Sequence, residues 1–181
     1  ILKEAYKKKL EQGMVAAAFA EEGEFGTAQE IMDEKKKKGI GGRPMEVSVL
    51  LVDDEKDFVE TLAERLETRG FKVSKAFSGD ECLETIRKDH IDVVLLDVLM
   101  PGKDGIETLR EIKQTNPLIE IMMLTGHATI DTAIKGLKLG AYDYLNKPTE
   151  TKDLVEKILR AYARKSEQEE RIRRAQIDKI V

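Results

Sequence analysis

Residues 91–105 read IDVVLLDVLMPGKDG, and this stretch decides how the chain folds. Its first six residues include an unbroken aliphatic run, which is typical of a strand covered by helices on both faces. Asp97 follows that run, and the Pro-Gly pair at 101–102 predicts a loop before the next helix. In parallel α/β sheets, ligands bind at the loops that follow the strands. We therefore expect a three-layer α/β fold with a functional site beside Asp97.

The same pattern repeats on both sides of this stretch. Further strand-like runs occupy residues 47–52, 71–77, 118–125 and 141–145, and amphipathic segments lie near 56–68, 79–88, 106–114 and 130–139. Strands that alternate with helices are typical of a parallel sheet. With a long last helix, the pattern predicts five strands and five helices.

The N-terminal segment differs in composition from this pattern. Residues 35–44, KKKKGIGGRP, predict a linker. Residues 2–22 and 27–37 predict two helices, and AFAEEGEFGTAQEIM at 18–32 resembles the centre of a tetratricopeptide repeat. Because one repeat cannot bury its own apolar face, we expect this helical hairpin to need a partner, which could be the rest of the chain, another copy or a different protein.

The C-terminal segment has no Gly or Pro from 149 to 181, so a single helix could cover all of it. The division expected is therefore a helical hairpin and linker at 1–44, an α/β domain at 45–165 and a helical extension at 166–181. The apolar residues of the extension do not keep a heptad spacing. A frayed charged helix and a dimerising or signal-transmitting helix both remain open.

Composition excludes several classes of protein. The chain has 31 Lys and Arg against 35 Asp and Glu, a net charge of −4, which argues against direct nucleic-acid binding. Its best apolar runs, at 14–20 and 47–52, are too short to cross a membrane. Cys82, the single cysteine, excludes an internal disulfide and a cysteine-based zinc site. It favours a reducing compartment, and we expect a cytoplasmic location.

Polar residues end the predicted strands. They are Asp53, Asp54, Asp97, Thr125 and, through Asn146, Lys147. Because the carboxyl ends of parallel strands meet at one edge, three carboxylates would lie close together, and they need a cation or a proton. Mg²⁺ prefers such oxygen ligands.

The carboxylates alone allow a structural acid patch, a metal-dependent hydrolase or a carboxylate that becomes phosphorylated. Lys147 and Thr125 favour the last, because an ammonium group and a hydroxyl can both bind phosphoryl oxygens. Phosphoryl transfer to a carboxylate needs positioning and charge neutralisation rather than a general base.

Four motifs resemble the receiver domains of two-component response regulators. They stand in order as VLLVDDE (49–55), LLDVLMPGKDG (95–105), MLTGHA (123–128) and YDYLNKP (142–148). The resemblance implies a flavodoxin-like (βα)5 fold with sheet order 2-1-3-4-5. GAYDYLNKP and the TGH triplet look most like receivers of the nitrogen-regulatory, enhancer-binding class.

The resemblance also implies the roles of the site residues. Asp97 would be the phosphoacceptor, and Thr125 and Lys147 would contact the phosphoryl group. Mg²⁺ would be bound by Asp54, Asp97 and the backbone carbonyl of Leu99, with Asp53 acting mainly through water. The peptide bond between Lys147 and Pro148 would be cis.

A conformational switch is part of the same resemblance. The hydroxyl of Thr125 would move toward the phosphate and Tyr144 would turn inward, which shifts a population between two states. The output surface would comprise the fourth helix, fifth strand and fifth helix of the domain. Leu99 and His127 would influence the dephosphorylation rate.

The expected function is that of a signalling receiver, which accepts a phosphoryl group from a histidine kinase or phosphotransfer protein and catalyses only its own phosphorylation and dephosphorylation. A homodimer could form through the output surface or the C-terminal helix. Two alternatives are a phosphorylation-independent interaction scaffold and a fragment of a larger regulator with a missing output domain. A metal-dependent phosphatase would need a second acid and a substrate cap, and neither is visible after Asp97.

Overall fold

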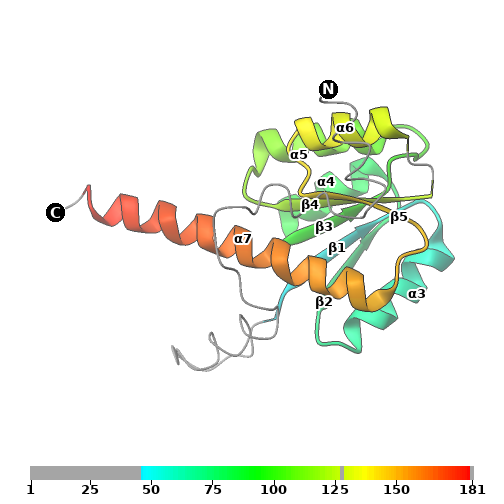
Figure 1. Cartoon of the computed structure of the whole chain (residues 1–181), viewed down its shortest axis with the longest axis horizontal. Helices are drawn as coiled ribbons and strands as arrows, with labels where there is room; N and C mark the ends of the chain where they lie inside the picture. The colour runs from blue at the N-terminus through cyan, green and yellow to red at the C-terminus, as the bar shows by residue number, and fades with distance from the viewer. Residues whose placement is uncertain (1–45, 127–128, 180–181) are drawn as a thin grey trace.

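The computed structural model describes residues 46–126 and 129–179, and the hairpin expected in residues 1–44 lies outside them. The described residues form a parallel five-stranded sheet between two layers of helices (Figure 1). The strands are β1 (Ser48–Val52), β2 (Lys72–Ala76), β3 (Val93–Leu96), β4 (Glu120–Thr125) and β5 (Asp143–Asn146). The helices are α3 (Lys56–Glu67), α4 (Gly79–Lys88), α5 (Gly105–Thr115), α6 (Ile130–Lys138) and α7 (Thr151–Ile177).

The strand order is β2-β1-β3-β4-β5, and every neighbouring pair is parallel. This confirms the predicted three-layer α/β class and the flavodoxin-like order that the resemblance implied. Among the described residues, the five strands and five helices also lie where the sequence pattern placed them, within about two residues at most ends.

The central strand β3 shows why its sequence is apolar without alternation. Val94 and Leu96 belong to the core cluster that packs beneath α4, α5 and α6. Val93 and Leu95 belong to the cluster on the opposite face, which packs against α3 and α7. Successive strand residues point to opposite faces, and here both faces are covered, so each position needs an apolar side chain.

Helix α7 is longer than the sheet that it covers. Its 27 residues span about 40 Å. Leu154, Ile158 and Ala161 are buried against the sheet, whereas every residue from 169 to 177 is exposed. The helix therefore leaves the body of the domain and projects from it (Figure 1). The helix begins at Thr151 and ends at Ile177, so it is shorter at both ends than residues 149–181, the segment without Gly and Pro.

None of the helices in the described part of the chain combines the length and the apolar content needed to span a membrane.

Cys82 lies on the buried face of α4, and burial raises the pKa of its thiol to about 12. A thiol must ionise to react with alkylating or disulfide reagents. We therefore expect the folded chain to resist such reagents at mildly alkaline pH and to take up one equivalent after unfolding in denaturant. A Glu64→Cys variant, which adds a thiol at an exposed position of α3, is the control. Modification of native Cys82 as fast as of that added thiol would contradict this burial.

Candidate functional site

The carboxyl ends of four strands bring the predicted site residues to one edge of the sheet. Val52 pairs with Leu96, and Leu96 pairs with Met123, so β1, β3 and β4 end side by side. Backbone hydrogen bonds continue the ladder past the strand ends: Asp97 N donates to Val52 O at 2.9 Å, and Lys147 N donates to Thr125 O at 2.9 Å. The sheet itself therefore sets the spacing of the site.

The three carboxylates form one cluster. Asp53, Asp54 and Asp97 each offer an oxygen atom, and these atoms all lie within 4.8 Å of one another. Asp53 and Asp97 are only 3% and 5% exposed, whereas Asp54 is open to solvent. Burial raises the pKa of Asp53, although hydrogen bonds from Lys147 and from the backbone of Glu55 act in the opposite direction.

The loop after β3 holds the carboxylate of Asp97. Val98 N donates to Asp97 Oδ1 at 2.8 Å, and Gly105 N donates to Val98 O at 2.8 Å, which folds the loop back onto the strand end. Asp104 then accepts a hydrogen bond from Glu107 N at 2.9 Å and caps α5. The sequence PGKDG thus gives both the turn and the start of the next helix.

Lys147 supplies a positive charge beside the cluster. Its Nζ donates to Asp53 Oδ2 and lies 3.3 Å from Glu55 Oε1. It also lies 4.0 Å from the ring centroid of Phe58, a cation–π contact. Burial alone would lower the pKa of Lys147, but the hydrogen bond and charge of Asp53, with Asp97 and Glu55, outweigh it and raise the pKa. Lys147 is therefore held as a cation.

The charges in this cluster do not balance. One ammonium group faces three carboxylates, so the cluster favours an additional cation. Every donor is an oxygen atom, two of the three carboxylates are fixed by burial, and one side is open to water. This donor set fits Mg²⁺, which binds through one or two carboxylates and keeps several waters.

The other predicted residues lie around this cluster. Thr125 is fully buried at the end of β4, and the side chain of Leu99 is 54% exposed on the loop after β3. Tyr144 is buried, with its hydroxyl 3.2 Å from Thr132 Oγ1 on α6. The peptide bond from Lys147 to Pro148 is cis, as expected. His127 lies outside the described residues.

Two contacts and one hollow at the site were not predicted from the sequence. They are the pairing of Glu55 with Lys147, the placement of Phe58 under Lys147, and a hollow of 410 Å³ between α3 and the start of α7. Lys147 and Pro148 line this hollow together with Phe58 and Leu154. The charged residues that follow Asp53 in the sequence do not indicate that Glu55 and Phe58 will contact Lys147, which follows β5. Only the fold reveals these contacts.

The family model for the response regulator receiver domain matches residues 49–159, which is more than half of the chain. The chain belongs to the response regulator receiver family. All the site residues described above fall inside the matched range. The resemblance to receiver domains is thereby confirmed.

Curated relatives of the receiver are longer proteins. The transcriptional regulatory protein CpxR of Escherichia coli is 43% identical over 118 residues, which cover 65% of this chain and 50% of the relative. The transcriptional regulatory protein ZraR of Salmonella typhimurium is 40% identical over 117 residues, which cover 65% of this chain and 26% of the relative. The chain thus matches half or less of the length of these relatives.

Solved structures of receivers have the same fold. A CheY-like receiver domain from Methanospirillum hungatei superposes with a TM-score of 0.66 at 28% identity, covering 68% of this chain and 98% of that one. A receiver domain from Clostridium thermocellum superposes with a TM-score of 0.64 at 38% identity, covering 66% of this chain and 97% of that one. NtrX from Brucella abortus superposes with a TM-score of 0.66 at 33% identity, covering 70% of this chain and 29% of NtrX.

Proposed function

We propose that this receiver accepts one phosphoryl group on Asp97 from a histidine kinase or phosphotransfer protein, and that phosphorylation changes its association with other proteins. The observation that carries the proposal is the meeting of three carboxylates with Lys147 at the carboxyl edge of the sheet. That combination suits the transfer of a dianionic group to a carboxylate better than it suits a structural acid patch.

In the proposed reaction a carboxylate oxygen of Asp97 attacks the phosphorus atom of the donor. The new P–O bond forms as the P–N bond to the donor imidazole breaks, and the imidazole takes a proton from solvent. No general base is needed, because the carboxylate is already ionised. Asp97 is held for this step by Val98 N and by the sheet ladder, which leaves little reorganisation before transfer.

Two further side chains bind the transferred group in this proposal. Lys147 Nζ places a positive charge beside the phosphoryl oxygens, and the hydroxyl of Thr125 donates a hydrogen bond to one of them. Asp53, Asp54 and Asp97, with the carbonyl of Leu99, would hold Mg²⁺, which supplies further charge neutralisation at these oxygens. Loss of the phosphoryl group by hydrolysis would return the receiver to its first state, at a rate influenced by Leu99 and His127.

The output of the switch belongs to the same proposal. Movement of Thr125 toward the phosphoryl group, coupled to Tyr144, would alter the surface formed by α6, β5 and α7, and a homodimer through this surface is one expected partner. A cytoplasmic location stays part of the proposal. Direct nucleic-acid contact is not part of it, given the net negative charge.

Two alternatives to this proposal make different predictions. The matched share of CpxR and ZraR supports a fragment of a longer regulator with an output domain. A phosphorylation-independent scaffold would be favoured by partner binding that survives Asp97→Ala unchanged.

The test is intact mass after incubation with acetyl phosphate, with Mg²⁺ or with a chelator. We expect a gain of one phosphoryl group that requires Mg²⁺. No gain under any condition would contradict the proposal and favour the scaffold, and a gain that persists in chelator would contradict the metal's role.

Magnesium binding itself gives a separate prediction. We expect Mg²⁺ to raise the unfolding temperature of the receiver, because a ligand that binds only the folded state stabilises it. Asp54→Asn removes one exposed ligand and should weaken Mg²⁺ affinity by about tenfold or more. Thermal unfolding across a Mg²⁺ titration measures both effects. The matched control is Glu64→Gln, an exposed acid on α3; an equal loss of affinity in that variant would assign the effect to surface charge.

A further inference from the structure

Three buried carboxylates line the opposite edge of the sheet, where the strands begin. Asp92 lies directly before β3, Glu120 opens β4 and Asp143 opens β5, and all three are buried. We call them the edge carboxylates. They are far from the cluster of Asp53, Asp54 and Asp97, because parallel strands place their two ends on opposite edges of the sheet.

Each edge carboxylate is paired with a basic residue of α7. Lys157 Nζ lies 2.5 Å from Asp143 Oδ2, Arg164 Nε lies 3.3 Å from Glu120 Oε1, and Lys165 Nζ lies 2.9 Å from Asp92 Oδ1. Lys157 and Arg164 are seven residues apart, which places them two turns apart on one face of the helix. The pairs therefore follow the helix across the sheet toward the point where it leaves the domain.

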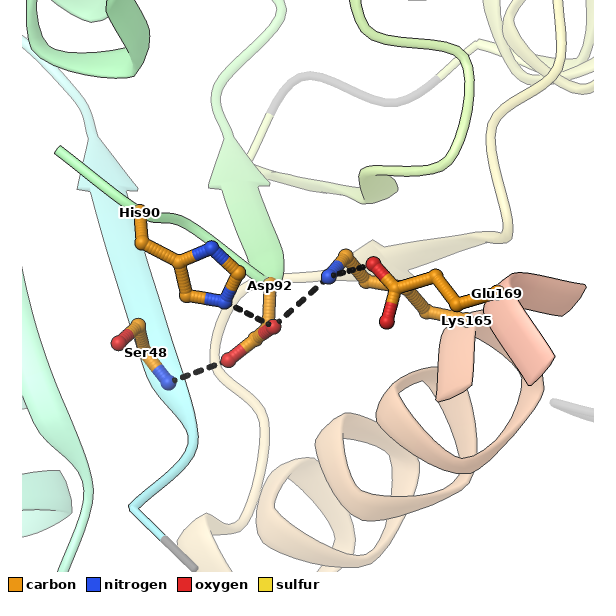
Figure 2. Close-up of polar contacts among 5 residues, drawn as sticks. All are labelled: Ser48, His90, Asp92, Lys165 and Glu169. Carbon is orange, nitrogen blue, oxygen red and sulfur yellow. Dashed lines mark hydrogen bonds and ion pairs between the residues drawn. The ribbon is translucent and has the colours of Figure 1, made fainter. Parts of the chain in front are cut away.

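The last of these pairs is the most deeply buried. The side chains of Lys165 and Asp92 are only 4% and 5% exposed, whereas that of Arg164 is half-exposed. Asp92 contacts two residues besides Lys165 (Figure 2). Its Oδ2 accepts a hydrogen bond from Ser48 N on β1 at 2.9 Å, and its Oδ1 also contacts His90 Nε2 at 3.0 Å. A single carboxylate thus joins β1, the start of β3 and α7.

Lys165 also reaches beyond the body of the domain. Its Nζ donates to Glu169 Oε1 at 2.6 Å, one turn further along α7 (Figure 2). Lys165 is the last buried residue of the helix, and Glu169 is the first of the continuous exposed stretch. The lysine therefore links the core of the receiver to the segment 166–177, which we call the α7 extension.

The α7 extension carries its own stabilising pairs. Glu167 contacts Arg171, and Glu170 contacts Arg174, both with the acid one turn before the base. This is the favourable orientation for such pairs on a helix. Its exposed large apolar residues are Ile172 and Ile177, which do not form a heptad stripe. A helix that is polar on nearly all sides can persist in water when such pairs support it.

We propose that the contact of Lys165 with Asp92 and Glu169 fixes the direction in which the α7 extension leaves the receiver, so that residues 166–177 stand out as a rigid single helix. Lys165 is a positioning residue in this device. Buried ion pairs add little net stability, because desolvation offsets their attraction, and their best-attested use is to specify one arrangement. The contact lies at the edge of the sheet opposite to Asp53, Asp54 and Asp97, and its role does not depend on phosphorylation.

The test measures the distance distribution between two spin labels by pulsed electron paramagnetic resonance. One label is placed at Glu64→Cys on α3 and the other at Arg173→Cys on the α7 extension, both exposed positions. Native Cys82 can stay in place because it is buried. A second label pair, Glu64→Cys with Arg110→Cys on α5, reports on the body alone.

We expect a narrow distribution for the α7 extension in the otherwise native chain, and a distribution about twofold broader or clearly shifted in Lys165→Met, because local order falls once the contact is lost. The body pair should not change. Lys152→Met, which removes an exposed lysine from the first turn of α7, is the matched control and should leave both distributions unchanged.

Two further variants keep the test decisive if Lys165→Met unfolds. The double variant Asp92→Asn with Lys165→Met removes both buried charges, and Glu169→Gln alters only the exposed end of the contact. A broad distribution in the native chain, or an equally narrow one in all three variants, would overturn the proposal. So would distances between chains together with a doubled mass in light scattering, since a second copy would then hold the α7 extension.

Discussion

Replacing Asp97 with asparagine is expected to abolish phosphorylation of the receiver. The amide keeps the size of the side chain and can still accept the hydrogen bond from Val98 N through its carbonyl oxygen. It lacks the ionised oxygen that would form the P–O bond, so the loss should be complete rather than partial. Intact mass after incubation with acetyl phosphate and Mg²⁺ measures it.

Stability gives this variant an internal control. Removing one of three neighbouring carboxylates relieves repulsion, so the unfolding temperature of Asp97→Asn without Mg²⁺ should equal or exceed that of the parent chain. Lost phosphorylation in a well-folded variant then reports on chemistry alone. Phosphorylation of Asp97→Asn at the parental level would place the acceptor elsewhere and overturn the assignment.

Gly105→Ala, at the first residue of α5, is expected to cause a large loss of stability. A Cβ at this position would lie 2.0 Å from the carbonyl oxygen of Asp97 and 2.8 Å from Val98 Cα, and both are backbone atoms that cannot rotate away. The loop or the start of α5 must move to relieve the contact. We expect a loss of about 3 kcal/mol or more in the free energy of unfolding, measured in urea.

The clash in Gly105→Ala should also displace Asp97, the proposed acceptor, since the oxygen atom that the added Cβ meets belongs to that residue. The phosphorylation rate should therefore fall even at temperatures where the variant is folded. Gly126→Ala is the matched control, because a Cβ there meets nothing within 4 Å. That variant should change stability by no more than about 0.5 kcal/mol. Equal stability of the two variants would show that the loop adapts to the added methyl group.

The fold could be predicted closely from sequence because its signals are local. The aliphatic runs around Val94 and Ile121 mark buried strands, and the Pro-Gly pair at 101–102 marks the loop that follows the first of them. The order of the strands could not be predicted from periodicity, and its prediction rested on the resemblance to receivers. Strand order is a property of long-range pairing, which a local pattern does not contain.

The candidate site was also accessible from sequence, for a related reason. Residues that end parallel strands converge whatever the details of packing, so Asp53, Asp97 and Lys147 could be grouped before their distances were known. The contacts of Lys147 with Phe58 on α3 and with Glu55 just before that helix could not be predicted, because they depend on how the helix packs beside the strand end.

The contact of Lys165 with Asp92 was missed altogether. These residues are 73 positions apart, and a lysine in a charged helix ordinarily indicates a solvent-exposed face. Only the position of α7 under β3 reveals that this lysine is buried and paired. Glu120 was missed in the same way, as a buried acid at the start of an apolar strand.

The projecting helix has a consequence for how the chain behaves in solution. A compact domain with a projecting helix tumbles more slowly and has a larger frictional coefficient than a sphere of equal mass. Gel filtration calibrated with compact standards will therefore report too large a mass, and a single chain can be mistaken for a dimer. The oligomeric state of this receiver is accordingly better read from light scattering or sedimentation equilibrium, whose results do not depend on shape.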